Sequence, residues 1–382
     1  MKWKALWIII LLACLLQPIL SIYQQKDKFF SRGYHALYEE YKNAYDSSQY
    51  VVKKNPGIIP DETFESFAAG AFLKGLNPIL IVHDHPPLGR YILSGSIAVF
   101  DNVHIAILIA LGFSLIGIFM ITRLLTSNIF VSLLPVGAFA NESLFLNKLT
   151  YTPLPEPIQL PFIIFSFYFF LKAMKEKKDI PYFIATALSI GCVISIRFFV
   201  LGAVIAASMG LYLILRRKFD RKFKYFLCSF PLTVFVLFLS YTRTMLESKN
   251  PLQFLSIQKY ILSYHSTKFI LPFTFWDLFF FNRWHTWWGS RQVLSDPQWN
   301  ILWPITYVIS YFSAIYSYLR KIPFKDGEKV LLIYIALISI MLSTGYTSTR
   351  YFLPILPFTY ILATSFVFAL LNNKLVKKPK KK

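Results

Sequence analysis

Long apolar runs recur along the whole sequence, and they constrain its fold more than any other feature. As a helix, a run of about 18 or more apolar residues can cross roughly 30 Å of hydrocarbon. Apolar runs of about this length lie at 5–23, 103–122, 127–146, 157–171, 181–196, 198–215, 225–242, 300–319, 330–345 and 351–371. Only 15% of the residues are charged, whereas soluble domains have about 25%. The sequence therefore predicts one all-α domain over residues 1–382, a polytopic integral membrane protein with about ten transmembrane helices.

The basic residues are concentrated in alternate loops of this topology. With the N-terminus inside, Lys and Arg gather in the cytoplasmic segments 2–4, 172–178, 216–224, 320–329 and 374–382. Cytoplasmic loops near span ends collect basic residues, so we expect a multi-pass cell-membrane protein with both termini in the cytoplasm. The net charge of +21 then reflects topology and contact with anionic membrane lipids, not binding of nucleic acid. The three cysteines exclude a disulfide-dense scaffold.

Two long segments interrupt the succession of spans, and both fall on the outer side of the membrane. We call them the first loop (24–102) and the second loop (243–299). Long ordered loops in compact proteins are usually functional. In the first loop, Pro60 followed by Asp61 and Glu62 is typical of a helix start. The apolar residues that follow predict an amphipathic juxtamembrane helix lying at the interface.

The acids of this predicted helix allow two interpretations. Asp61 and Glu65 are four residues apart and share one helix face, with Glu62 beside them. One interpretation is that the acids only complement the positive end of the helix macrodipole. The other is that Asp61 is a base or a cation ligand.

A second polar motif, His83-Asp84-His85, comes directly before Pro86-Pro87. Proline disfavours a helix at the residue before it, so this segment is expected to be extended. Alternate residues of an extended chain face oppositely, which predicts His83 and His85 on one side and Asp84 on the other. A metal site built from these three residues is one alternative.

The two motifs together resemble a known group of proteins. Asp61-Glu62, followed about twenty residues later by His85-Pro86-Pro87-Leu88-Gly89-Arg90, is similar to the dolichyl-phosphate-mannose protein O-mannosyltransferase and ArnT-like group of the GT-C superfamily. Three looser similarities accompany it, all on the outer side of the topology: Glu156-Pro157 before a span, Arg197 between two spans, and Arg350-Tyr351 with Pro354 before the last span.

This resemblance implies an inverting transferase that moves a mannose-like sugar from a polyprenyl phosphate to an acceptor hydroxyl on the outer face. Asp61 would be the base and Glu62 would position the base or the acceptor. The implied substrate-binding residues are His85, Arg90, Glu156, Arg197, Arg350 and Tyr351, because arginine binds phosphate well. For the arginines the alternative is anchoring at the headgroups, and for Glu156 an ordinary ion pair. No metal ligand is assigned, and a divalent metal remains a possible cofactor.

The second loop is rich in tryptophan. Trp276, Trp284, Trp287, Trp288 and Trp299 fall within it, and Trp303 follows. One interpretation is an interfacial aromatic belt, and the other is a platform that binds the sugar or the polyprenyl chain.

Two rival functions stay open at this point. The first is the same chemistry on a lipid or glycan acceptor, of the lipid A or lipopolysaccharide type, instead of a protein. The second is a transporter or lipid flippase. Transporters often contain internal repeats and polar sites at the bilayer midplane. The motif at 61–90 is not repeated, and the singled-out polar residues fall at the outer surface, which favours chemistry at the interface.

Overall fold

The computed structural model describes residues 2–30, 33–150, 153–197, 199–216, 220–266, 271–286, 292–322 and 324–372. The elements are α1 (Lys2–Gln24), α2 (Lys26–Phe30), α3 (Tyr34–Asp46), α4 (Asp61–Leu73), α5 (Pro78–Ile81), α6 (Leu88–Phe100), α7 (His104–Thr126), α8 (Ile129–Ala140), α9 (Ser143–Thr150), α10 (Pro155–Lys175), α11 (Ile180–Ile196), α12 (Val200–Leu215), α13 (Arg221–Ser240), α14 (Thr242–Ser248), α15 (Gln253–Ser266), α16 (Thr274–Phe281), β1 (Trp284–His285), β2 (Val293–Leu294), α17 (Leu302–Leu319), α18 (Asp326–Ser343), the 3₁₀ turn η1 (Thr349–Phe352) and α19 (Leu356–Leu371).

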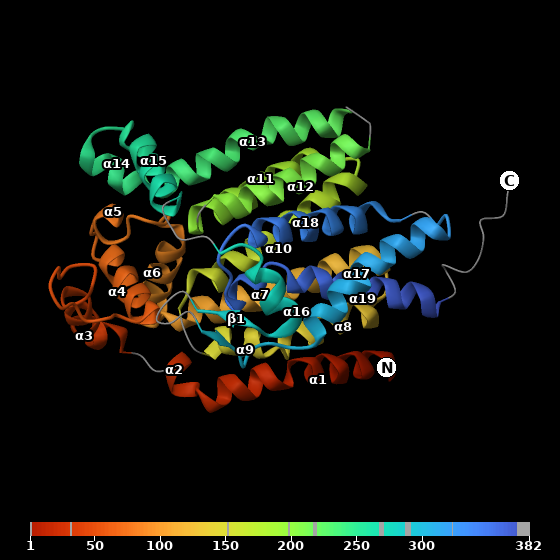
Figure 1. Ribbon diagram of the computed structural model, residues 1–382, viewed down its shortest axis with the longest axis horizontal. Helices are drawn as coiled ribbons and strands as arrows, with labels where there is room; N and C mark the ends of the chain where they lie inside the picture. The colour runs from red at the N-terminus through yellow and green to blue at the C-terminus, as the bar shows by residue number, and fades with distance from the viewer. Residues whose placement is uncertain are drawn as a thin grey trace.

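The predicted all-α fold is confirmed. Figure 1 shows the long helices side by side in one bundle, with α3 to α6, α14 and α15 gathered at one of its ends. Each predicted apolar run is helical, although the run at 127–146 divides into α8 and α9. The two strands form a single antiparallel pair, Trp284 opposite Leu294.

The number of membrane spans stays a prediction. By length and composition, four helices of the described chain can cross a membrane: α7, α10, α13 and residues Trp7–Gln24 of α1. The pair α8 and α9, bent by 66°, makes a fifth if it counts as one broken span. The helices α6, α11, α12 and α19 are apolar but shorter.

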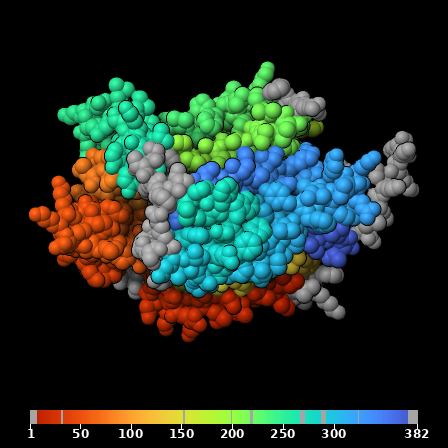
Figure 2. Space-filling view, in the orientation of Figure 1, coloured from red at the N-terminus to blue at the C-terminus, as the bar shows by residue number. Residues whose placement is uncertain are grey.

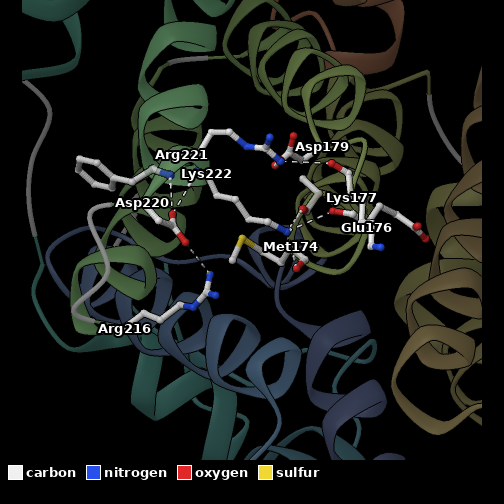
Figure 3. Close-up of polar contacts among 10 residues, drawn as sticks. Met174, Glu176, Lys177, Asp179, Arg216, Asp220, Arg221 and Lys222 are labelled. Carbon is white, nitrogen blue, oxygen red and sulfur yellow. Dashed lines mark hydrogen bonds and ion pairs between the residues drawn. The ribbon is translucent and has the colours of Figure 1, made fainter.

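The end of the bundle opposite the two loops is held together by basic side chains. Figure 3 shows Lys222 at the start of α13, whose ammonium donates to the carbonyl oxygens of Ala173 and Met174 at 2.7 Å each. Arg221 pairs with Asp179 at 3.3 Å, just before α11 begins. Cations are favourable at the C-terminal end of a helix, where carbonyl groups lack partners. These lysines and arginines therefore fasten α13 and α11 to the end of α10.

Two other predicted basic segments meet at the same end. Lys175 donates to the carbonyl oxygen of Leu124 at 2.6 Å, and Lys325 donates to that of Leu125 at 2.8 Å. The ends of α7 and α10 and the start of α18 therefore lie together. The predicted topology requires this, because it places all three on the cytoplasmic side. The basic residues at 217–219 and 374–382 lie outside the described residues.

The first loop contributes a helical layer over one end of the bundle, coloured orange in Figures 1 and 2. Its helix α4 begins at Asp61, as predicted, but it does not lie at an interface with one face exposed. Residues 64–72 are buried on every side. Tyr45 of α3 stacks on Phe64 and Phe67, two residues of the predicted apolar face, with 6.1 and 4.3 Å between ring centres. The amphipathic interpretation was therefore wrong, because α3 covers the face assigned to lipid.

The tryptophans of the described second loop and its flank do not form a belt around the protein. Trp276, Trp284 and Trp299 are half-buried and pack against the main hydrophobic core. Trp303 is fully buried in α17. Trp287 and Trp288 lie outside the described residues.

The break between α8 and α9 contains Glu142, which is 1% exposed. Its carboxylate accepts hydrogen bonds from the Tyr360 hydroxyl, from Trp303 Nε1 at 3.0 Å and from Asn300 Nδ2 at 3.4 Å. Neutral donors from before α17, from α17 and from α19 thus converge on one carboxylate. Glu142 ties the broken helix to the last part of the bundle.

Replacing Glu142 by glutamine is expected to destabilise the protein. The new amide would direct a donor at groups that themselves donate, and a lost buried hydrogen bond costs about 1–3 kcal/mol. Thermal unfolding of the purified protein in detergent measures this loss. Glu40→Gln, which changes an exposed glutamate of α3, is the control and should unfold at the wild-type temperature. Equal unfolding temperatures for the two variants would contradict the assigned role of Glu142.

Candidate active site

A cavity of about 870 Å³ lies between the first loop and the bundle. Seven of the eight site residues predicted from the sequence line it: Asp61, His85, Arg90, Glu156, Arg197, Arg350 and Tyr351. These residues come from α4, α6, α10, the α11–α12 connection, η1 and the segment before α6. Apolar residues line it too: Val200 and Leu201 of α12, and Ile338, Met341 and Leu342 of α18.

Proline explains why several polar residues stand at helix ends. Pro60 has an extended backbone (φ −64°, ψ 148°) and immediately precedes Asp61 at the start of α4. Pro155 is the first residue of α10 and places Glu156 in its first turn. Proline suits the first turn because its missing N–H would have no helical partner there. Each helix start therefore presents its carboxylate to the cavity without burying an unpaired backbone donor.

Two arginines share one buried glutamate on the cavity wall. Arg197 Nη1 lies 2.5 Å from Glu156 Oε1, and Arg350 Nε lies 3.5 Å from the same oxygen. Arg350 also reaches the first loop, because its Nη1 donates to Asp61 Oδ2 at 3.0 Å. Glu156 is therefore in an ion pair, as the alternative from the sequence proposed. The two arginines thus share one buried carboxylate, and the second carboxylate, Asp61, is 61% exposed and can be exchanged for another anion.

Tyr351 lies against both guanidinium groups. Its ring centre is 5.3 Å from the Arg197 Cζ and 5.4 Å from the Arg350 Cζ. Burial alone would raise the pKa of Tyr351, but the two arginines outweigh it and lower that pKa below its usual value. The pKa of Arg350 is raised, since Glu156, Tyr351 and Asp61 together outweigh the cost of burial. The wall thus combines two permanent cations with an acidic phenol, all able to donate to an anion.

Arg90 does not anchor a helix at the headgroups. It is 3% exposed, and its Nη2 donates to Glu65 Oε1 at 2.6 Å. Glu65 lies one turn after Asp61 on the predicted common face of α4, and both line the cavity. The shared face was the only signal for Glu65, and sequence reasoning did not include it in the site.

Glu62 does not line the cavity. It occupies the first turn of α4 beside Asp61, and its charge acts on Lys28 of α2, opposing the lowering of that lysine's pKa by burial. Its role in positioning substrate stays a prediction.

The expected arrangement of His83, Asp84 and His85 was wrong. Asp84 and His85 both line the cavity, while His83 packs against the rings of Tyr260 and Tyr264 at 5.6 and 6.1 Å. Residues 84 and 85 are in a bend instead of a regular extended strand, so the alternation of sides does not hold. His85 Nδ1 lies 2.9 Å from Asp84 Oδ2.

Three further cavity residues carried no recognisable signal in the sequence. Tyr264 and His265 come from the end of α15, and Tyr50 comes from the connection after α3. Burial raises the pKa of Tyr50 to about 12, with the nearby charges of Asp84 and Asp61 adding to the shift. Tyr50, Asp61 and Asp84 thus line the same cavity.

The acidic residues of the described cavity wall are each already paired. Asp61, Glu65 and Glu156 pair with arginine, and Asp84 pairs with His85. Within the described residues, no group of three or more His, Cys, Asp or Glu is arranged to hold a metal ion.

Comparison with known proteins agrees with this architecture. Residues 84–241 match the family of dolichyl-phosphate-mannose-protein mannosyltransferases. ArnT from Cupriavidus metallidurans bound to undecaprenyl phosphate superposes with a TM-score of 0.53 at 12% identity, over 88% of this chain and 59% of ArnT. The oligosaccharyltransferase of Archaeoglobus fulgidus in its apo form gives 0.55 at 10% identity, over 93% of this chain and 54% of the enzyme. No curated protein sequence matches the chain.

The bundle with its loop-covered cavity thus has the fold of the ArnT and oligosaccharyltransferase structures, and the resemblance predicted from the sequence is confirmed. The part of the chain from Asp84 to Tyr241 is similar to the dolichyl-phosphate-mannose-protein mannosyltransferases. The chain spans less than two thirds of the length of the two solved structures.

Proposed function

We propose that the protein transfers a mannose-like sugar from a polyprenyl phosphate to an acceptor hydroxyl, with inversion at the anomeric carbon. The observation that carries this proposal is the composition of the cavity. A carboxylate, a cluster of arginines and an apolar wall meet in one space of about 870 Å³, and a lipid-linked sugar phosphate needs all three.

The donor binds to both the polar and the apolar part of the cavity lining. Its phosphate binds Arg197, Arg350 and Tyr351, because guanidinium groups give strong charge-assisted hydrogen bonds to phosphate. Its polyprenyl chain lies between α12 and α18, along Leu201 and Leu342. ArnT from Cupriavidus metallidurans, which has the same fold, was crystallised with undecaprenyl phosphate, and a ligand of that kind fits this division.

Asp61 is the proposed base. It takes the proton of the acceptor hydroxyl while the acceptor oxygen bonds to the anomeric carbon and the bond from that carbon to the phosphate oxygen breaks. The phosphate leaves with the electron pair and is stabilised by the arginines. Arg350 contacts Asp61 at 3.0 Å, so a phosphate on Arg350 competes with Asp61 for this cation and frees the carboxylate for the acceptor hydroxyl.

The location of the site follows from the two ends of the bundle. The basic segments gather at one end of the bundle, and the first loop, whose residues help to line the cavity, lies at the other end (Figure 1). Because cytoplasmic loops are basic, we place the termini in the cytoplasm and the cavity at the outer face of the cell membrane. The acceptor is a protein hydroxyl, with a lipid or glycan hydroxyl as the alternative.

Reconstitution tests this function. Purified protein in liposomes is given polyprenyl-phosphate mannose labelled in the sugar, with hydroxyl acceptors of the peptide, lipid and glycan classes. We expect the label to move to an acceptor, or to water when none is present. Labelled lipid that crosses the bilayer with its sugar still attached would replace this function by that of a flippase.

The same assay with EDTA tests for a divalent metal. We expect an unchanged rate, since the acids of the described cavity wall are each paired with arginine or histidine. A rate lost in EDTA and restored by a divalent cation would contradict this and assign a metal to the reaction.

A further inference from the structure

Asp84, His85 and His265 form an ordered cluster on the cavity wall. The carboxylate of Asp84 lies 2.9 Å from His85 Nδ1, and the backbone carbonyl of Asp84 lies 3.0 Å from His265 Nε2. The two imidazole rings meet edge to face, 5.2 Å between centres. Asp84 is therefore held at both its side chain and its backbone, and the His85 ring is fixed between Asp84 and His265.

These contacts determine where the protons of the imidazoles lie. A carboxylate or a carbonyl oxygen can only accept a hydrogen bond, so His85 Nδ1 and His265 Nε2 must both be protonated. A neutral imidazole has one N–H and one lone pair. The lone pair of His85 is therefore on Nε2, at the edge of the ring away from Asp84.

The surroundings keep His85 neutral. Burial lowers the pKa of His85 to about 4, and Arg197 and Arg90 lower it further against the opposing effect of Asp84. The other lining groups that face this cluster are Tyr50 and Tyr264. A neutral Nε2 lone pair cannot bind a phosphate oxygen, which also accepts. It needs a hydroxyl donor.

The proposed donor supplies such a hydroxyl at the required place. Arg197, which lines the same cavity as His85, is one of the arginines assigned to the phosphate. In a sugar phosphate, the hydroxyl next to the anomeric carbon is the ring hydroxyl closest to the phosphate. A sugar bound with its phosphate on Arg197 thus brings this hydroxyl toward His85.

We propose that His85 Nε2 accepts a hydrogen bond from the donor-sugar hydroxyl adjacent to the anomeric carbon, with Asp84 as the residue that positions the ring. His85 is then a specificity-determining residue that selects donors carrying this hydroxyl. The inference rests on the proposed function and names the part of the donor that one cavity residue recognises.

A comparison of two donor substrates, in wild type and in one variant, tests this contact. The kcat/KM of polyprenyl-phosphate mannose is divided by that of the 2-deoxy donor, for wild type and for His85→Ala. Removing the hydroxyl also changes the intrinsic reactivity of the sugar, but this effect is the same in both proteins and cancels. The ratio is expected to fall about 10- to 100-fold in the variant, since the 2-deoxy donor leaves a buried acceptor unpaired only in wild type.

Several variants separate recognition from folding. Asp84→Asn should lower the ratio in the same direction by loosening the ring, and added imidazole should restore it in His85→Ala by filling the space left. His35→Ala is the matched control, because His35 makes the same kind of pair with Asp101 away from the cavity. It should leave the ratio unchanged.

The outcomes distinguish this inference from the function on which it depends. A wild type that transfers mannose with the same donor ratio as His85→Ala would overturn the assignment of His85 and leave the transferase intact. A wild type that cleaves no polyprenyl-phosphate sugar, with or without the hydroxyl, would overturn the function itself.

Discussion

Asp61→Asn is expected to reduce sugar transfer by about 10²-fold or more, the contribution of a general base. Asparagine has nearly the same volume and can still accept the hydrogen bond from Arg350, but it cannot take a proton. Asp61 is 61% exposed at the helix start, and exposed ion pairs contribute little to stability. The loss should therefore be in kcat, with thermal unfolding and affinity for the donor lipid close to wild type.

Glu62→Gln is the comparison variant for Asp61→Asn. Both residues stand in the first turn of α4, so a general effect of acids on this helix would appear equally in the two variants. We expect the larger loss at Asp61, because Asp61 lines the cavity and Glu62 does not. Single-turnover transfer and binding of labelled polyprenyl phosphate give the two quantities. Wild-type turnover in Asp61→Asn would show that Asp61 only completes the helix start.

The sequence predicted the helices and the helix ends of the site because both depend on local signals. Apolar runs determine where α7 or α13 lies, and prolines such as Pro60 and Pro155 determine where α4 and α10 begin. Asp61, Glu62 and Glu156 stand at these starts. Local physics therefore positions them whatever their partners are.

Partners could not be predicted, because they come from distant parts of the chain. Arg350 meets Asp61 across 289 residues, and His265 meets Asp84 across 181. The prediction that α4 lies at an interface failed for the same reason, since its apolar face is covered by Tyr45 of α3. Periodicity shows that a helix has an apolar face, but it does not show whether lipid or protein covers that face.

Because Arg197 shares Glu156 with Arg350, replacing Arg197 is expected to have the largest combined effect on sugar transfer and on stability. Arg197→Gln removes one of the two cations proposed for the leaving phosphate, and loss of one such group typically costs about 10²- to 10³-fold. It also leaves Glu156, which is 6% exposed, with Arg350 at 3.5 Å as its remaining ion-pair partner. Breaking a buried pair on one side costs about 3 kcal/mol or more. The single variant should therefore be both inactive and unstable.

The double variant Glu156→Gln/Arg197→Gln separates these two effects. Neutralising both members removes the buried carboxylate that Arg350 alone would balance at 3.5 Å, and replacing a whole buried pair is often close to neutral for stability. We expect its unfolding temperature to return toward wild type while kcat/KM stays about 10²-fold low or lower. Thermal unfolding in detergent and transfer in liposomes measure the two quantities on the same preparations. A double variant that regained transfer together with stability would show that Arg197 acts only through Glu156, and the phosphate would then belong to Arg350 and Tyr351 alone.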